Sequence, residues 1–170
     1  MSNSMFKVFV YGTLKRGQPN NKMMEGIFDG EVTYMGRGLT GKAYPLVISA
    51  AKWNLPCMLS VEGTGKKIHG EVFEVDQEML GFLDLFEGHP DFYKRSQIIV
   101  QLTEDHDGRK LDPPGIHTCW CYFFLHYDRS YLTLPFLDNY NSWGPHGQMY
   151  DEEEREDNSK EAGKTKDGPR

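Results

Sequence analysis

The sequence predicts a single α+β domain built on a β-barrel or a mixed β-sheet. A chain of 170 residues can bury one sizeable core but is too short for two ordinary domains. Five short segments rich in β-branched and aromatic residues lie between Gly, Pro and Asp turns, and only one stretch has clear helical periodicity. We expect residues 5–150 to form the domain.

The predicted strands occupy residues 7–11, 44–49, 70–75, 96–102 and 118–126. In the first of them, Phe6, Val8 and Val10 alternate with other residues, as in a strand with one buried face. This strand leads into a turn that contains Gly12 and Gly17. Backbone N–H groups exposed at such a turn can hold a carboxylate, a phosphate or a developing oxyanion.

The predicted helix begins after Asp76, a good N-cap residue, and ends near Glu87 and Gly88. Its apolar face is formed by Met79, Leu80, Leu83 and Phe86. Gly88 suits the left-handed residue that commonly follows a helix.

Charge and composition exclude several classes of protein. The formal net charge is −6, and a generic nucleic-acid binder needs a basic face instead. Residues 151–170 hold eight acids against five bases and almost no apolar side chain, so we expect a disordered charged tail there. We expect no signal peptide and no spanning helix, because the longest apolar run has seven residues. Three cysteines without paired spacing favour a reducing, cytosolic setting over disulfides or zinc.

The glycine-rich turn does not match a nucleotide-binding loop. A Walker motif requires Lys and Ser or Thr after the second glycine, whereas Gln18 and Pro19 follow Gly17. Without further evidence, this segment could equally be a plain hairpin turn.

Glu87 is a candidate acid or base because of its unusual place. A carboxylate at the C-terminal end of a helix lies beside the negative pole of the helix dipole, where Lys or Arg is usual. Next to Phe86, such a carboxyl should have a raised pKa, which suits a group that takes and gives a proton near pH 7. The alternative is a solvated surface residue. Asp84, one turn earlier, is either its carboxylate partner or an exposed helix acid.

Other groups give weaker indications. His117, Cys119 and Cys121 fall on one face of a predicted strand, where core packing is a better explanation than a Cys–His nucleophile. The six histidines have no metal-ligand spacing. Residues 140–147, rich in aromatic and turn residues, form either a lid over a pocket or the closure of the barrel.

Three motifs in order resemble the γ-glutamylcyclotransferase-like (AIG2-like) family: Val10–Gly17, Phe82–Glu87 and Gly144–Gly147. The likeness covers about residues 5–150. It implies a single-domain α+β fold, a small mixed β-barrel with short flanking helices. One departure is Leu85, where close relatives carry a second Asp.

The resemblance also implies a reaction and a site. Family members of this kind are lyases that convert γ-glutamyl amines, such as the γ-glutamyl-ε-lysine left by degraded transglutaminase cross-links, to 5-oxoproline and the free amine. The family's catalytic acid/base maps onto Glu87. Its substrate-binding loop maps onto Tyr11, Gly12, Thr13 and Leu14. Because amine and carbonyl belong to one substrate molecule, we expect no metal or organic cofactor.

Two alternatives stay open at this point. One is a cyclotransferase that acts on γ-glutamyl α-amino acids or glutathione. The other is a non-catalytic ligand-binding member of the same fold. In each case we expect a monomer in the cytosol that binds a small molecule. We expect it to bind neither nucleic acid nor a membrane.

Overall fold

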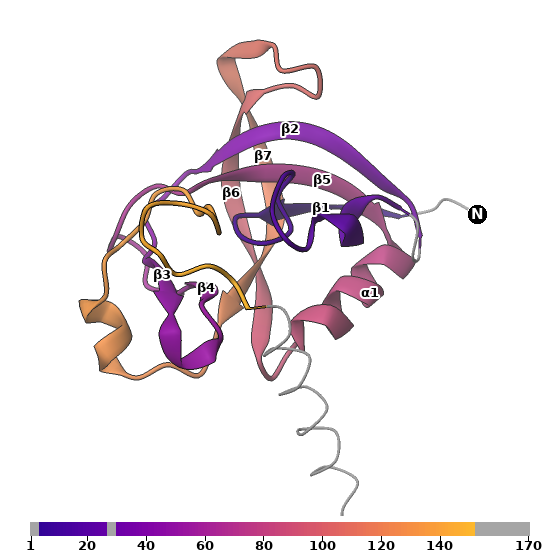
Figure 1. The fold of residues 1–170 in the computed structure, drawn as a ribbon. Coiled ribbons are helices and arrows are strands. Elements are labelled where there is room, and N and C mark those ends of the chain that lie inside the picture. Colours follow the sequence, from indigo (N-terminus) through magenta and orange to yellow (C-terminus); the bar gives the residue numbers. More distant parts are fainter. Residues whose placement is uncertain (1–3, 27–29, 152–170) are drawn as a thin grey trace, which may run out of the picture.

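The barrel consists of five strands in the closed order β1-β5-β2-β6-β7 (Figure 1). The computed structural model describes residues 4–26 and 30–151. The strands are β1 (Met5–Val10), β2 (Val32–Thr40), β5 (His69–Asp76), β6 (Tyr93–Glu104) and β7 (Lys110–Phe124). Neighbours pair antiparallel except β1 and β7, which are parallel and meet at Val8 and Trp120. The predicted small mixed barrel is confirmed.

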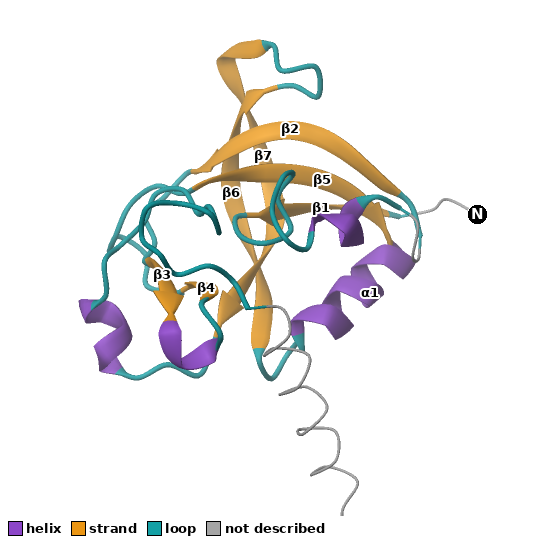
Figure 2. Cartoon of the chain, viewed as in Figure 1, coloured by secondary structure: helices purple, strands orange, loops and turns teal. Residues whose placement is uncertain are grey.

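A separate antiparallel hairpin stands beside the barrel. It pairs β3 (Leu46–Ser49) with β4 (Leu55–Met58), and the short 3₁₀ helix η2 (Ala50–Lys52) lies between them. Two further 3₁₀ helices are η1 (Asn21–Met24) and η3 (Arg129–Thr133). Figure 2 shows the loops that connect these elements.

Strands β2 and β4 were not predicted, and their composition explains why. β2 contains Gly36 and Gly38, residues that normally weaken a strand. At Gly36 the register with β5 shifts and φ is 143°, so this position requires glycine. β4 is only four residues long and contains Pro56. β6 is longer than predicted at both ends, and β7 begins earlier than predicted, because their pairing continues into the projecting hairpin that joins them, but β7 ends at Phe124, before its predicted end.

The helix α1 (Gln77–Glu87) agrees with the prediction at both ends. The side chain of Asp76 accepts a hydrogen bond of 2.9 Å from the N–H of Met79. Gly88 ends the helix in the left-handed conformation, with φ at 66°. Since the helix begins directly after β5 and lies along the barrel, its last residue is carried back toward the end of β1 (Figure 1).

Two apolar clusters form the core. Met79, Leu80 and Leu83 of α1 belong to the first, together with Phe73 and Val75 of β5 and Val8 and Val10 of β1. The neighbouring β5 residue, Val72, belongs to the second, with Phe9, Val100 and the hairpin residues Ile48 and Met58. Adjacent residues of a strand face opposite ways, so β1 and β5 each contribute side chains to both clusters.

Within the described residues, no helix has the length and apolarity needed to cross a membrane. The predicted charged tail, residues 151–170, lies outside the described residues apart from Asp151.

Candidate active site

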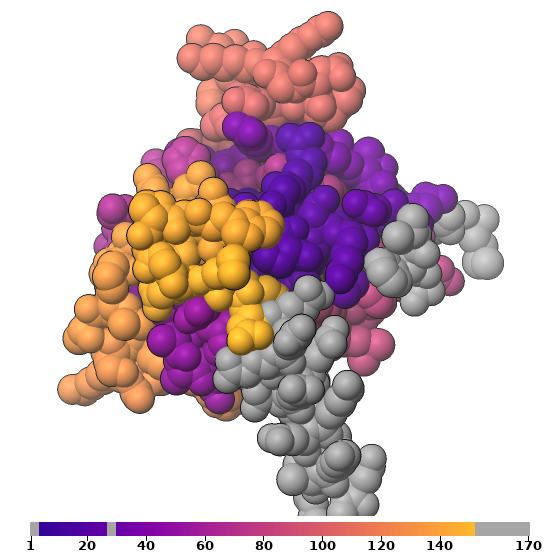
Figure 3. Space-filling model, in the orientation of Figure 1, coloured from indigo at the N-terminus to yellow at the C-terminus, as the bar shows by residue number. Residues whose placement is uncertain are grey.

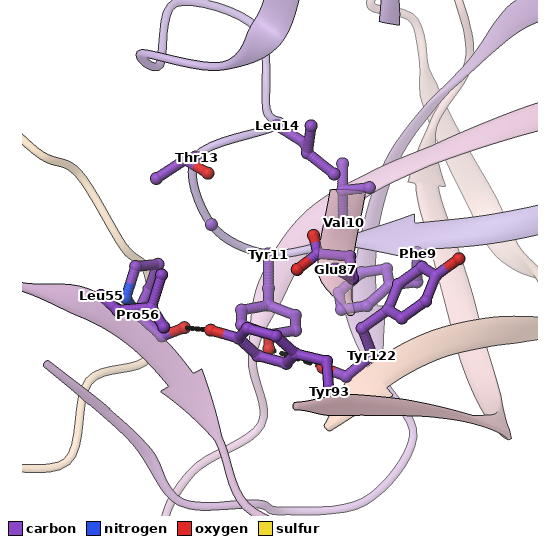
Figure 4. A pocket seen from close by; sticks show the side chains of 11 residues that line it. Phe9, Val10, Tyr11, Thr13, Leu14, Leu55, Pro56, Glu87, Tyr93 and Tyr122 are labelled. Carbon is purple, nitrogen blue, oxygen red and sulfur yellow. Dashed lines mark hydrogen bonds between the residues drawn. The ribbon is translucent and has the colours of Figure 1, made fainter. Parts of the chain in front are cut away.

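A pocket with about 380 Å³ of empty space lies where the end of β1, the β3–β4 hairpin, the end of α1 and β7 meet (Figure 4). It contains all five predicted site residues: Tyr11, Gly12, Thr13, Leu14 and Glu87. The sequence did not point to the other lining residues, which are Phe9, Val10, Leu55, Pro56, Tyr93 and Tyr122. These walls come from elements far apart in the chain, so only the fold brings them together.

Glu87 is buried and belongs to the pocket. Its exposed fraction is 8%, which makes the surface interpretation wrong. Figure 4 shows its carboxylate pointing toward the turn that carries Tyr11 and Thr13. Leu85, the expected departure from the family pattern, is 84% exposed and does not line the pocket. That departure from the family pattern therefore leaves the pocket lining unchanged.

The turn after β1, here called the binding loop (residues 11–20), is fixed by its own contacts. The N–H of Asn20 donates to the carbonyl of Thr13 at 2.8 Å, and the Asn20 amide donates to the Thr13 hydroxyl at 3.0 Å. Among the described residues, no backbone carbonyl outside helices and strands accepts a hydrogen bond from the N–H groups of Gly12, Thr13 or Leu14. Such a fixed row of N–H groups can receive a carboxylate or an oxyanion.

Three tyrosines build the wall of the pocket. The Tyr11 hydroxyl donates to the Tyr122 carbonyl at 2.6 Å, and the Tyr93 hydroxyl donates to the Pro56 carbonyl at 2.6 Å. Burial raises the pKa of Tyr11 well above its usual value, so this hydroxyl stays neutral. Both hydroxyls are thus committed to backbone oxygens and hold the strands that line the pocket.

The two cationic side chains of the binding loop, Lys15 and Arg16, are bound to groups outside the pocket. The Arg16 N–H donates to a Glu71 carboxylate oxygen at 2.6 Å, and the Arg16 guanidinium binds the second oxygen at 3.1 Å. The guanidinium also lies 3.7 Å from the centre of the Tyr34 ring. Lys15 is buried, and its ammonium donates to Asn139 and to the Tyr140 carbonyl. Burial lowers the pKa of Lys15 to about 8.

Residues 137–151, here called the strap, join the binding loop to the β3–β4 hairpin. On the loop side, Gln18 accepts from the Ser142 N–H at 2.8 Å and donates to Asn141 at 3.3 Å. On the hairpin side, Asn54 donates to the Met149 carbonyl at 2.9 Å. Figure 3 shows the yellow strap lying against the indigo loop. No strap residue lines the pocket, so the lid expected for residues 140–147 is wrong. The barrel strands close through β1 and β7, and Tyr140 of the strap is fully buried in the second core cluster beside them.

We expect Gln18→Ala to raise the KM for substrate about fivefold, because a lost neutral hydrogen bond costs about 1 kcal/mol and the binding loop loses its link to the strap. Steady-state kinetics would measure the change. Gln77→Ala, an exposed change of the same kind in α1, should leave KM unaltered. Equal KM values in both variants would remove the strap from any part in holding the loop.

The cysteines follow the packing interpretation. Cys119 and Cys121 are buried, and burial raises the pKa of the Cys119 thiol to about 11 and that of Cys121 well above its usual value. His117 lies 2.8 Å from the Lys7 ammonium. Both thiols therefore stay protonated, and the prediction that they pack in the core is confirmed.

A buried carboxylate facing a row of backbone N–H groups, in a pocket of a small mixed barrel, indicates a class of protein: an enzyme that acts on a small substrate. Residues 8–143 match the family model described as gamma-glutamyl cyclotransferase, AIG2-like. The chain belongs to this family.

Relatives of known name cover almost the whole domain. The chain is 44% identical to gamma-glutamylaminecyclotransferase of Mus musculus over 151 residues, which span 88% of this chain and 99% of that protein. It is 41% identical to the Homo sapiens protein of the same name, with the same coverage of both chains. The crystal structure of an AIG2-like protein from Mus musculus matches with a TM-score of 0.77 and 41% identity, over 86% of this chain and 95% of that one.

Proposed function

We propose that the protein is a γ-glutamylamine cyclotransferase, a lyase that converts γ-glutamyl amines such as γ-glutamyl-ε-lysine to 5-oxoproline and the free amine. Relatives that are 41–44% identical over nearly their full length carry this name. The observation that carries the chemistry is the buried Glu87 carboxylate facing the binding loop.

The first step makes the nucleophile. The α-ammonium of the γ-glutamyl group cannot attack until it loses a proton, and Glu87 accepts that proton. The freed amine forms a C–N bond to its own γ-carbonyl carbon, which becomes tetrahedral. The negative charge on the carbonyl oxygen is then stabilised by the N–H groups of Gly12, Thr13 and Leu14.

The second step expels the amine. Protonated Glu87 returns its proton to the nitrogen of the leaving group, the bond between that nitrogen and the γ-carbon breaks, and the carbonyl reforms in the five-membered ring. Glu87 then takes the second proton from the ring nitrogen and passes it to the released amine, which leaves as an ammonium. Glu87 therefore ends as an ionised carboxylate, as it began. Since both reacting groups belong to one molecule, the pocket has only to hold a folded conformer. The prediction that no metal or cofactor takes part stays a prediction.

The pocket lining favours an amine over an α-amino acid as the leaving group. The described residues that line it include no Lys, Arg or His, and Lys15 and Arg16 are bound elsewhere. A leaving amino acid would place a second carboxylate next to its nitrogen, close to Glu87 and without a cation. Burying such a charge unpaired is costly. The charged end of γ-glutamyl-ε-lysine lies several bonds farther away.

The test is to incubate the purified protein with γ-glutamyl-ε-lysine, γ-glutamyl-alanine and glutathione separately, and to follow 5-oxoproline by mass spectrometry. We expect release from the first alone. Release only from the others would move the substrate class to γ-glutamyl α-amino acids or glutathione. Thermal protection by the substrates without product would favour a non-catalytic binding protein.

A monomer in the cytosol, without nucleic-acid or membrane partners, completes the proposal. The net charge of −6 argues against a nucleic-acid partner, and cysteines without paired spacing in the sequence favour a reducing cytosol. Light scattering on the eluting peak of a sizing column would measure the oligomeric state, and a mass twice 19.6 kDa would contradict it.

A further inference from the structure

Asp84 is neither the carboxylate partner of Glu87 nor a plain exposed acid, the two expectations from the sequence. It accepts two hydrogen bonds from the Arg95 guanidinium, from Nε at 2.9 Å and from Nη2 at 3.3 Å. It also accepts a hydrogen bond of 2.7 Å from the Tyr122 hydroxyl. The side chains of Asp84 and Arg95 are only 22% and 20% exposed. One turn before Glu87, this acid therefore has a fixed place.

Other contacts hold this cluster in place. The Arg95 guanidinium lies 4.3 Å from the centre of a Trp120 ring, and the Arg95 N–H donates to His89 at 3.2 Å. The His89 ring meets the Tyr122 ring edge-on, with centroids 6.4 Å apart. Both Arg95 and Tyr122 are thus oriented by more than the carboxylate alone.

Tyr122 connects this cluster to the pocket. Its ring lines the pocket together with Glu87. In Figure 4 the Tyr122 hydroxyl points away from the Glu87 carboxylate. A tyrosine beside a carboxylate would ordinarily offer it a hydrogen bond. Here that donor is given to Asp84.

We propose that Asp84 is a positioning residue for the reaction: it holds the Tyr122 hydroxyl away from Glu87, so that Tyr122 presents its ring and not a hydrogen-bond donor to the catalytic carboxylate. The inference rests on the proposed role of Glu87. A hydrogen bond from Tyr122 would stabilise the charged form of Glu87 and make it a weaker base. By accepting that donor, Asp84 preserves the ability of Glu87 to take the substrate's proton.

The titratable groups around Glu87 support this assignment. Tyr11 lines the pocket with it from the end of β1, Tyr93 from β6 and Tyr122 from β7, and Cys121 of β7 lies close enough for the charge of Glu87 to act on its thiol. Burial raises the pKa values of Tyr11, Cys121 and Tyr122, so these groups are neutral while the enzyme works. On its own helix Glu87 has Asp84 as a charged neighbour, and that charge is paired with Arg95.

Three variants separate the hydroxyl from the charge. Asp84→Asn removes the charge but keeps an oxygen that accepts from Tyr122, whereas Asp84→Ala removes both. The double variant Asp84→Ala/Tyr122→Phe also removes the released hydroxyl. The acid limb of the pH profile of kcat/KM, with γ-glutamyl-ε-lysine as substrate, reports the protonation of Glu87 in the free enzyme.

We expect Asp84→Ala to move the acid limb about one pH unit lower, since a hydrogen bond to a charged group is worth about 1.5 kcal/mol or more. The limb should move less in Asp84→Asn, and in the double variant it should return to the Asp84→Asn position. An unmoved limb in Asp84→Ala, or an equal shift in the double variant, would overturn the proposal.

A second measurement needs no turnover. Titration of the Glu87 carboxyl carbon by NMR, in protein labelled at glutamate, should give the same order of pKa values among the variants. If the wild-type protein forms no 5-oxoproline, the proposed function fails, and this titration still tests the placement of the Tyr122 hydroxyl. Circular dichroism melts would identify a variant that does not fold.

Discussion

Glu87→Gln should reduce the formation of 5-oxoproline from γ-glutamyl-ε-lysine by at least about 10³-fold, while substrate binding and the fold are retained. Acid–base catalysis by one side chain contributes about 10² to 10⁴ in rate, and here the same carboxyl is proposed to act in both proton transfers. Glutamine has the same shape, so a buried side chain at the end of α1 can be replaced without a cavity. Single-turnover assays by mass spectrometry would measure the loss.

The matched control is Glu78→Gln, the same chemical change at an exposed position in the first turn of α1. It should leave kcat unchanged and alter stability by a few tenths of a kcal/mol, since it removes only a favourable charge near the helix N-terminus (about 0.3–1 kcal/mol). Appreciable residual turnover in Glu87→Gln, with the melting temperature unchanged, would take Glu87 out of its proposed role.

Gly12→Ala is expected to lower kcat/KM by about 10²-fold, or roughly 2.7 kcal/mol of transition-state stabilisation. A Cβ atom at Gly12 would lie 2.8 Å from Cγ of Pro56, whose ring cannot turn aside. Either the binding loop or β4 has to move to relieve this contact. A movement of the loop displaces the N–H groups that are proposed to hold the oxyanion. Kinetics with γ-glutamyl-ε-lysine would measure the effect.

Gly81→Ala provides the comparison for this change. Gly81 lies inside α1, and a Cβ there would meet nothing within 4 Å. That variant should keep full activity and gain up to about 1 kcal/mol in stability, because alanine is the better helix former. Full activity in Gly12→Ala would mean that close contact between the loop and Pro56 is not needed for the reaction.

The sequence alone was sufficient for the parts of the structure that depend on local chemistry. The helix follows from Asp76, the apolar spacing and Gly88, and all three act where they were expected. β1 follows from simple alternation. β2 could not be predicted because its glycines are explained only by the register with its neighbours. The same is true of β4, whose proline is acceptable in a short two-stranded hairpin.

Only part of the site could be predicted, because some of its residues are brought together by contacts between distant parts of the chain. The motif resemblance gave Glu87 and the binding loop, and the structure places them around one pocket. Tyr93 lies outside the predicted strands and Tyr122 lies within one, and nothing in the sequence around them reveals that both line the pocket with Glu87. The partner of Asp84 is 11 residues away and that of Gln18 is 124 residues away, so no local pattern could have shown either contact.

The strap also bears on how the protein is made. The binding loop is synthesised long before the strap, yet the side chains of Gln18 and Lys15 form their hydrogen bonds with residues 139–142. At about 5–20 residues per second, a ribosome needs on the order of ten seconds to cover that interval. During this time the ammonium of Lys15 lacks the acceptors that it has in the folded protein. The barrel is also still open, because β7 has not yet paired with its neighbours. We therefore expect catalytic competence to arise only after residues 139–142 have been synthesised and have left the ribosome.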